Sequence, residues 1–263
     1  MKVYKYYPPV EYAFRSFEEQ IVCFNSMANF TDKSEGNYKM VSRPEPAITE
    51  MDRIVNSATG SMARIISEKY TDFIRFKFRV LSVTDSALYK YMWNEYAQNG
   101  SGFCLEYDSN ELERYSSRWG EINYKDFKEP DGIFQDNFKP GDFCKVVDDI
   151  LFTKVPGVSA GEDYKQEHEI RYVLSIPKEM IEETDINDYI NNHLGHSKDK
   201  GYTYYADILS GKHFKARNLI FRKANVSRVI MGQMISKESS DRIKAIAAKQ
   251  GISLSKSVED ELL

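Results

Sequence analysis

Charged side chains alternate in the segment Tyr164–Tyr172, which reads YKQEHEIRY. Glu167, Glu169 and Arg171 are two residues apart, so a strand would place all three on one face. Burying three charged groups is costly unless they are paired or functional, and the planar fork of an arginine can hold a carboxylate or a phosphate. The segment therefore predicts a charged functional face, an exposed edge-strand face, or one internal Glu–Arg pair.

A second group of candidate side chains lies between residues 89 and 108. A helix expected over Asp85–Gln98 brings three aromatic rings to one face, because they are spaced i, i+4 and i+7: Tyr89, Trp93 and Tyr96. In the strand expected over 102–107 and the residue after it, two carboxylates point to the same side: Glu106 and Asp108. Rings beside paired carboxylates can bind a flat ring together with a hydroxyl or a metal ion. The alternative is an aromatic core stripe followed by a solvated edge.

Other short patterns give weaker signals. Lys5 lies on a first strand, where a cation can bind phosphate, and Asp32 is suited to capping a turn. His193 and His196 are spaced i, i+3 without an evident third ligand, so the histidines predict no metal site. The sequence contains no phosphate-binding glycine loop, GxSxG elbow or HExxH motif, which leaves kinase, serine-hydrolase and simple zinc-protease functions without support.

Short strands and helices are expected around these residues. The strands are predicted over 3–6, 21–24, 76–83, 102–107, 122–124, 169–176, 226–231 and 252–254. The helices are predicted over 11–17, 49–70, 85–98, 142–153 and 236–250, the last of them beginning at a serine cap and ending at Gly251. This pattern predicts an α+β fold with short mixed strands and peripheral helices, in a single compact domain over 1–263 with a loose tail at 255–263.

Composition narrows the class of protein. Hydrophobic residues make up 41% and charged residues 29% of the 263 residues, as in globular proteins. No apolar run approaches the roughly 18 residues that span a bilayer, so no membrane association is expected. The net charge of −4 gives no support to a general nucleic-acid binder. Three cysteines without a CxxC pair predict a cytoplasmic protein in a reducing compartment.

Several of these segments, in this order, resemble a bacterial and phage family known as domain of unknown function 2971. The similar motifs are Tyr4-Lys5-Tyr6, Phe30 with Asp32, Met92-Trp93 with Tyr96-Ala97, Gly102 to Leu105, Lys154, the Glu167-x-Glu169-x-Arg171 block and Val229 to Gly232. This sequence lacks the Trp that usually precedes the Glu-x-Glu-x-Arg block. The resemblance implies an accessory or effector protein, including a role in phage defence.

One function that the sequence leaves open is an NAD-using enzyme similar to ADP-ribosyltransferases or NAD glycohydrolases. Such folds place a cation or histidine on a first strand, an aromatic or serine on a second and a catalytic glutamate on a later strand. By this analogy the catalytic candidates are Glu169 for the ribosyl transition state, Glu167 for the acceptor and Tyr96 for stacking. The substrate-binding candidates are Lys5, Tyr6, Trp93, Lys154 and Arg171.

Two further functions compete with this one. A metal-dependent nuclease or phosphodiesterase would use Mg²⁺ bound by carboxylates, with Lys154 on a phosphate; the carboxylates would be Asp32, Glu106, Asp108, Glu167 and Glu169. A non-catalytic sensor would bind a small-molecule nucleotide or a partner peptide through Lys5, Trp93, Tyr96 and Arg171. The sequence does not indicate whether a protein or a nucleic acid is the acceptor. The proposed sites require that Lys5, Tyr96 and the Glu-x-Glu-x-Arg block meet in one cleft.

Overall fold

The computed structural model describes residues 1–30, 77–124, 143–154, 164–176, 181–184, 202–206, 213–217 and 219–255. Within these ranges helices and strands are mixed along the chain, which confirms the predicted α+β class. The predicted helix over 49–70, the candidate ligand Asp32, the pair His193 and His196, and the tail after Ser255 all lie outside the described residues.

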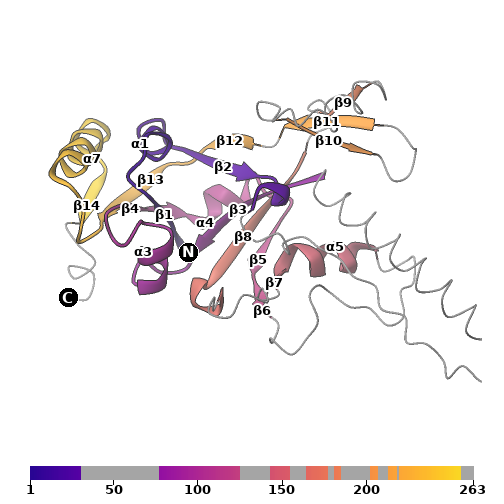
Figure 1. The fold of residues 1–263 in the computed structure, drawn as a ribbon, viewed down its shortest axis with the longest axis horizontal. Coiled ribbons are helices and arrows are strands. Elements are labelled where there is room, and N and C mark those ends of the chain that lie inside the picture. The colour runs from indigo at the N-terminus through magenta and orange to yellow at the C-terminus, as the bar shows by residue number, and fades with distance from the viewer. Residues whose placement is uncertain are drawn as a thin grey trace, which may run out of the picture.

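A nine-stranded sheet forms the centre of the described structure (Figure 1). Seven strands follow one another in the order β12 (Leu219–Lys223), β2 (Ile21–Asn25), β3 (Phe78–Thr84), β1 (Lys2–Tyr7), β4 (Phe103–Asp108), β13 (Val226–Met231) and β14 (Ser253–Ser255). The remaining two are β8 (Glu169–Ser175), which pairs with β3, and β5 (Arg118–Glu121), which pairs with β8. Two smaller sheets contain β10 (Tyr202–Ala206), β11 (His213–Arg217) and β9 (Ile181–Thr184), and β6 (Asn123–Tyr124) with β7 (Thr153–Lys154).

Strand β3 pairs with one strand along one of its edges and with two different strands along the other. Strand β8 pairs with the full length of β3 on one side, from Phe78 to Thr84. On the other side β1 pairs only at Thr84, and β2 pairs only at Val80. Strands β1 and β2 therefore diverge from a shared edge, and the middle of β3 between them is left for side chains to fill.

Helices cover both faces of the sheet. Figure 1 shows α1 (Glu11–Glu18) and α7 (Lys237–Gln250) above it, and α3 (Lys90–Glu95) and α5 (Phe143–Phe152) below it. The largest core joins α1 and α7 to the upper face, through residues such as Phe17, Phe103, Leu105 and Ile243. On the lower face one core packs against α5 and another packs against α3. Even-numbered residues of β3 and odd-numbered residues of β8 point to this lower face, because Val80 and Val173 belong to the α5 core.

Most predicted elements are present, and α7 ends as its sequence indicates. The Ser236 side chain accepts a hydrogen bond from the backbone N–H of Ser239 at 3.1 Å, and Gly251 closes the helix with a left-handed φ of 67°. Strand β14 then pairs in parallel with β13, as a strand–helix–strand crossover requires. Strands β5 and β12 were not predicted, because neither shows clear alternation of apolar residues.

The helix predicted over Asp85–Gln98 is much shorter. It begins at Lys90, after Tyr89 as an N-cap without a side-chain hydrogen bond, and it ends at Glu95. Asp85 does not cap it, because its carboxylate accepts a hydrogen bond from the Tyr89 hydroxyl at 2.7 Å. After the helix, Gln98, Asn99 and Gly100 all adopt positive φ, so the chain turns sharply into β4.

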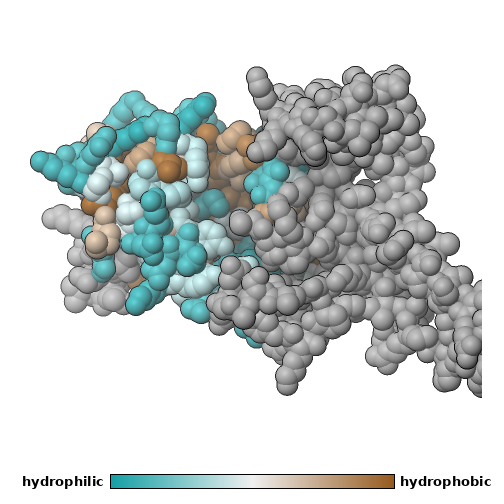
Figure 2. All heavy atoms as spheres, viewed as in Figure 1, coloured by the Kyte–Doolittle hydropathy of each residue, from teal (hydrophilic) through white to brown (hydrophobic). Residues whose placement is uncertain are grey.

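The outer surface matches the arrangement of the cores. Hydrophilic atoms cover the α7 side of the molecule in Figure 2, where exposed positions include Lys237, Glu238, Asp241 and Lys244. Apolar atoms show near the upper middle of the view, in the region of β12, where Leu219 and Phe221 are exposed. Among the described residues no helix is long and apolar enough to cross a bilayer.

Candidate functional site

Four charged side chains form a buried cluster on the lower face of the sheet. Lys154 Nζ lies 2.7 Å from Glu167 Oε2 and 3.7 Å from Glu169 Oε2. Arg171 donates two hydrogen bonds to Glu169, from Nε to Oε1 at 2.7 Å and from Nη2 to Oε2 at 3.2 Å. All four residues are at most 6% exposed. The predicted charged segment is therefore turned inward, and each charge is paired, as burial demands.

Glu167 reaches this cluster in a different way from that predicted. Only Glu169 and Arg171 lie on β8, whereas Glu167 ends the 3-10 turn η3 (Tyr164–Glu167). His168 separates the two carboxylates with a positive φ of 45°, which interrupts the strand. The prediction of one strand face carrying all three charges is wrong in this respect, although Lys154 still brings both carboxylates to one point.

Lys154 comes from β7, which follows directly after α5. Helix α5 also supplies the Leu151 carbonyl that accepts a hydrogen bond from Arg171 Nη1 at 3.0 Å. The Lys154 ammonium group lies 4.2 Å from the centre of the Tyr164 ring, a cation–π contact. Because Lys154 faces two carboxylates and a ring, its position gives no support to the predicted phosphate contact. Its contacts are those of a counterion for the carboxylates.

Aromatic side chains border the charged cluster. The Tyr96 hydroxyl donates a 2.6 Å hydrogen bond to Glu167 Oε1, while 42% of the residue remains exposed. The Tyr124 hydroxyl accepts a hydrogen bond from the backbone N–H of Glu169 at 2.9 Å. Sequence reasoning identified Tyr96 but missed Tyr124 and Tyr164. Tyr164 lies one turn before Glu167 in the same charged segment, which was a usable signal, whereas nothing local marked Tyr124.

The Lys5 side chain lies at the edge of this cluster, at the point where β1 and β2 diverge from β3. Its Nζ donates a 2.9 Å hydrogen bond to the Ser82 carbonyl, in the stretch of β3 between the β1 and β2 pairings. The Ser82 side chain also helps to lower the pKa of the Glu169 carboxyl. The Lys5 side chain is partly buried, and this burial lowers the pKa of its amine, against the opposing effect of charges such as Glu169.

The environment drives the pKa values of the two carboxyls apart. Burial raises the pKa of Glu167, and the Glu169 charge adds to this, although Lys154 and the Tyr96 hydroxyl act in the opposite direction. Burial also opposes ionisation of Glu169, but Arg171 and then Lys154 outweigh it, so that its pKa falls to about 2. Burial and the Glu167 charge raise the pKa of Tyr96, which keeps its hydroxyl protonated as a donor.

Two of the predicted substrate-binding residues lie in the core against α3. The Trp93 ring packs edge-on against the Tyr6 ring, with centroids 5.1 Å apart, and its indole N–H donates to the Ala87 carbonyl at 2.8 Å. The Tyr6 hydroxyl donates to the Ser86 carbonyl at 3.0 Å. Both residues are buried, with Trp93 6% exposed and Tyr6 5% exposed. The structure does not bring them into the charged cluster, and their contacts are those of packing.

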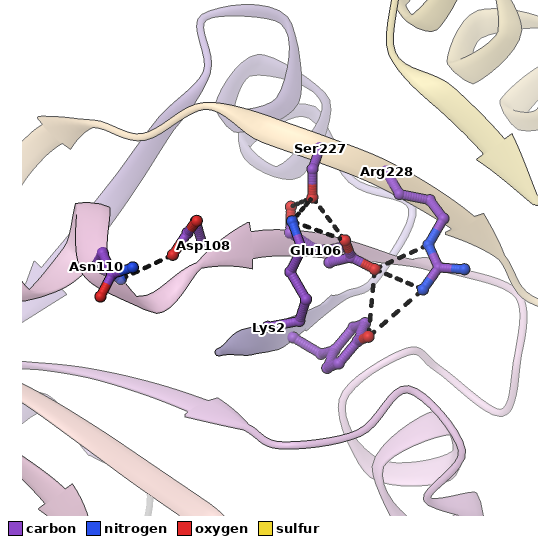
Figure 3. A network of polar contacts seen from close by, with 7 residues as sticks. Lys2, Glu106, Asp108, Asn110, Ser227 and Arg228 are labelled. Carbon is purple, nitrogen blue, oxygen red and sulfur yellow. Dashed lines mark hydrogen bonds and ion pairs between the residues drawn. The ribbon is translucent and has the colours of Figure 1, made fainter.

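Glu106 belongs to a second and separate network, shown in Figure 3. Arg228 contacts Glu106 Oε2 from Nε at 2.8 Å and from Nη2 at 2.5 Å, and the Ser227 hydroxyl donates to Oε1 at 2.7 Å. The β13–β4 register shifts between Val226 and Arg228, which lets two neighbouring residues face one carboxylate. Although burial opposes ionisation, these hydrogen bonds and the Arg228 charge lower the pKa of Glu106.

The carboxylates predicted for a magnesium site are thus divided. Asp108 caps α4 (Ser109–Glu113), where its Oδ1 accepts a hydrogen bond from the Asn110 N–H at 3.0 Å (Figure 3). Glu106 faces Arg228 instead. Within the described ranges, no three His, Cys, Asp or Glu side chains are grouped so that they could hold a metal ion.

Comparison with known proteins supports the family resemblance. Residues 92–215 match the model of a family described as a protein of unknown function, DUF2971. The matched segment contains Tyr96, Lys154, Glu167, Glu169 and Arg171, whereas Lys5 lies before it. The resemblance to this family is thereby confirmed over that segment. No curated protein and no solved structure matches the chain.

Proposed function

We propose that the cluster around Glu167 and Glu169 is the catalytic centre of an enzyme that cleaves the glycosidic C–N bond of a nucleotide, with NAD as its substrate. The observation that carries this proposal is that two carboxyls share one lysine, while their surroundings move their pKa values in opposite directions. Such a division of roles between neighbouring acids is typical of catalytic pairs, in glycoside cleavage among other reactions.

Glu169 suits the carboxylate role in this reaction. Breaking the bond between nicotinamide and ribose leaves positive charge on the ribosyl carbon, and a carboxylate that stays ionised stabilises that charge. Arg171 and Lys154 lower the pKa of Glu169 to about 2, so this carboxylate is ionised at neutral pH. In this mechanism Arg171 orients Glu169, because its guanidinium group donates two hydrogen bonds to that carboxylate and a third to the Leu151 carbonyl.

Glu167 suits the proton-transfer role. The nicotinamide ring of NAD is cationic, so it leaves with the bonding electron pair as a neutral molecule and needs no proton. The acceptor, either water or a group on a macromolecule, forms the new bond to the ribosyl carbon and gives its proton to Glu167. A carboxyl with a raised pKa is a more effective base near neutral pH, and Glu167 lies beside the exposed ring of Tyr96.

The order of the residues along the fold also supports an ADP-ribosyltransferase-like arrangement. Lys5 lies on the first strand and Glu169 begins β8, as in that arrangement, whereas Tyr96 follows helix α3 instead of lying on a second strand. Their contacts form one connected set, because Tyr96 bonds Glu167 and Lys5 bonds the backbone of Ser82 beside Glu169. This comparison is an analogy of arrangement, and the proposal depends on the chemistry of the cluster. Consumption of NAD would also fit the effector role that the family resemblance implies.

The test is release of nicotinamide from NAD by the purified full chain, measured by chromatography with and without cell extract. Glu167→Gln keeps the size of the side chain and one of the two oxygens that accept hydrogen bonds from Tyr96 and Lys154. We expect it to reduce the rate at least about 100-fold, the usual contribution of a proton-transfer group. Glu106→Gln is the matched control, because it alters an equally buried carboxylate in the other network. Absence of nicotinamide release from the wild-type chain under all conditions would refute the proposal.

A non-catalytic sensor is the second candidate, and one observation favours it. Both carboxylates of the cluster are paired with cations, as in a network that serves only to hold its arginine and lysine in place. In that case calorimetry would show NAD or another nucleotide binding to the chain without turnover. The metal-dependent nuclease is disfavoured, because Glu106 and Asp108 are engaged away from Glu167 and Glu169.

A further inference from the structure

A stacked pair of rings lies beside the proposed catalytic centre. The rings of Tyr89 and His168 are parallel to within 5°, and their centroids are 4.1 Å apart. The Tyr89 hydroxyl donates a 2.7 Å hydrogen bond to Asp85 Oδ1, which fixes the position of the Tyr89 ring in the stack. His168 itself is exposed to solvent, as a ring that stacks on a ligand must be.

The backbone of His168 adds an independent observation. Its φ of 45° lies in the left-handed region, which is unfavourable for most residues with a side chain. Asparagine adopts this conformation readily, and glycine does so without cost. The turn itself therefore does not require an imidazole ring at this position. An exposed ring that is already stacked next to Glu167, at a position where asparagine or glycine would serve the turn as well, suggests a functional use for the ring.

The stack lies some distance from the bond that would be cleaved. Tyr89 precedes α3 and Tyr96 follows it, so seven residues and about 10 Å separate their backbones at the helical rise. Tyr96 contacts Glu167, whereas Tyr89 contacts His168. The reacting carbon must lie within about 3.5 Å of the catalytic groups. With the ribosyl carbon beside Tyr96 and Glu167, the stack at the other end of α3 is placed for the base at the far end of a dinucleotide rather than for the leaving nicotinamide.

We propose that the Tyr89–His168 stack binds the purine base of a dinucleotide substrate, at the end remote from the cleaved bond. This assignment deepens the proposed function and rests on it. Stacking on an aromatic side chain tolerates different bases and needs only a flat ring. The subsite would make the enzyme prefer a dinucleotide over a mononucleotide that carries the same nicotinamide–ribose bond.

The experiment compares NAD with nicotinamide mononucleotide as substrates of the full chain. His168→Asn keeps a residue suited to left-handed φ and removes the aromatic platform. We expect the variant to raise the KM for NAD, relative to the KM for nicotinamide mononucleotide, by about 5- to 100-fold, the range found when a base loses one stacking ring. His168→Tyr, which restores a flat ring, should return the KM ratio toward that of the wild type. Glu95→Gln, at an exposed position of α3, is the control.

The outcomes separate this inference from the proposed function. If nicotinamide is released but His168→Asn leaves the KM ratio unchanged, the purine subsite is refuted while the catalytic proposal stands. If neither substrate is cleaved, the catalytic proposal fails, and calorimetry with AMP decides the subsite. AMP binding that His168→Asn and Tyr89→Leu both weaken supports the subsite. Absent AMP binding, or binding that neither variant changes, refutes it. Circular dichroism of each variant confirms that it is folded.

Discussion

Lys154 is the residue on which the charged cluster most depends. Its ammonium group is the contact that Glu167 and Glu169 share, and it also packs over the Tyr164 ring. A buried ion pair contributes little net stability compared with apolar residues, but removing one partner leaves the other charge buried and uncompensated. The cluster is therefore sensitive to loss of a single member, although its formation is not a strong source of stability.

Replacing Lys154 with methionine should accordingly destabilise the protein strongly. We expect the free energy of unfolding to fall by about 3–5 kcal/mol, as in other buried pairs that lose one partner. Lys154→Arg keeps the positive charge, so its free energy of unfolding should fall by clearly less than that of Lys154→Met. Guanidinium chloride unfolding at pH 7 measures both variants. A loss of less than about 1 kcal/mol in Lys154→Met would show that the carboxylates do not need this counterion.

Glu169 should make the stability of the fold depend on acid pH. Its pKa is lowered from an ordinary 4.5 to about 2 in the folded chain. Since the folded pKa lies below the unfolded one, this carboxylate contributes its full stability above about pH 4.5 and loses it as the pH falls toward 2. The shift corresponds to about 3 kcal/mol.

Urea unfolding of the wild type and of Glu169→Gln between pH 7 and pH 2.5 measures that contribution. The variant should be less stable at pH 7, and its stability should fall less steeply below pH 4.5 than that of the wild type. Other carboxyls with lowered pKa values, such as Glu106, remain in both proteins and cancel in the difference between the curves. That difference reports Glu169 together with its effect on Glu167, whose pKa the Glu169 charge raises. Parallel curves would show that Glu169 has no lowered pKa.

At the scale of elements, α3 is held at both ends. Tyr89, directly before its start, stacks on His168, and Tyr96, directly after its end, donates a hydrogen bond to Glu167. The chain beyond it is fixed by close backbone contacts, in which the Gly232 N–H donates to the Gly102 carbonyl at 2.9 Å. These contacts determine where Tyr96 lies relative to the charged cluster.

Gly102 should be intolerant of any side chain. A methyl group there would overlap the Tyr7 carbonyl oxygen, and backbone at the junction of β1 and β4 would have to move. We expect Gly102→Ala to lower the free energy of unfolding by about 3 kcal/mol or more, the upper range for overpacking. The matched control is Gly120→Ala in β5, where the added carbon meets only the Phe152 ring at 3.7 Å. Thermal unfolding of the two variants tests the difference, and equal losses would contradict it.

At the scale of the whole molecule, one row of paired residues crosses the sheet. Arg228, Glu106, Tyr4, Thr84 and Glu169 are consecutive partners on β13, β4, β1, β3 and β8. The two ionic networks stand at opposite ends of this row. Three strand spacings, about 14 Å, separate Glu106 from Glu169. Although the networks share one face of one sheet, this separation exceeds the roughly 7–10 Å within which sites usually couple, so we expect them to act independently.

A double-mutant cycle tests this independence. The destabilisation of Glu106→Gln combined with Glu167→Gln should equal the sum of the single effects within about 0.5 kcal/mol, as for distant sites. Within the charged cluster, Glu167→Gln combined with Lys154→Met should deviate from the sum by about 1 kcal/mol or more, because the two side chains are in contact. Coupling of that size between Glu106 and Glu167 would show that Tyr4 and Thr84 transmit between the networks.

The sequence by itself determined the α+β class, most of the strands and helices, and the identity of the charged residues in the cluster. These depend on local periodicity and on capping residues such as Ser236, which act over a few neighbours. Local patterns also indicated that Glu169 and Arg171 lie together on one strand face, because their spacing is fixed by strand geometry. The resemblance to the family followed from the same motifs.

Only the tertiary structure decided which of these residues meet. Trp93 and Tyr6 lie in the core, and Glu106 forms an ion pair with Arg228 instead of joining the other carboxylates. Tyr124 and Tyr164 contact the charged cluster. The tertiary structure also revealed the left-handed His168 and its stack on Tyr89. The reason is physical: local spacing fixes the direction of a side chain within its own element, whereas strand order and helix packing join segments far apart in the chain. The pairing of Lys154 with Glu167 and Glu169 follows from that packing and from the high cost of burying an unpaired charge.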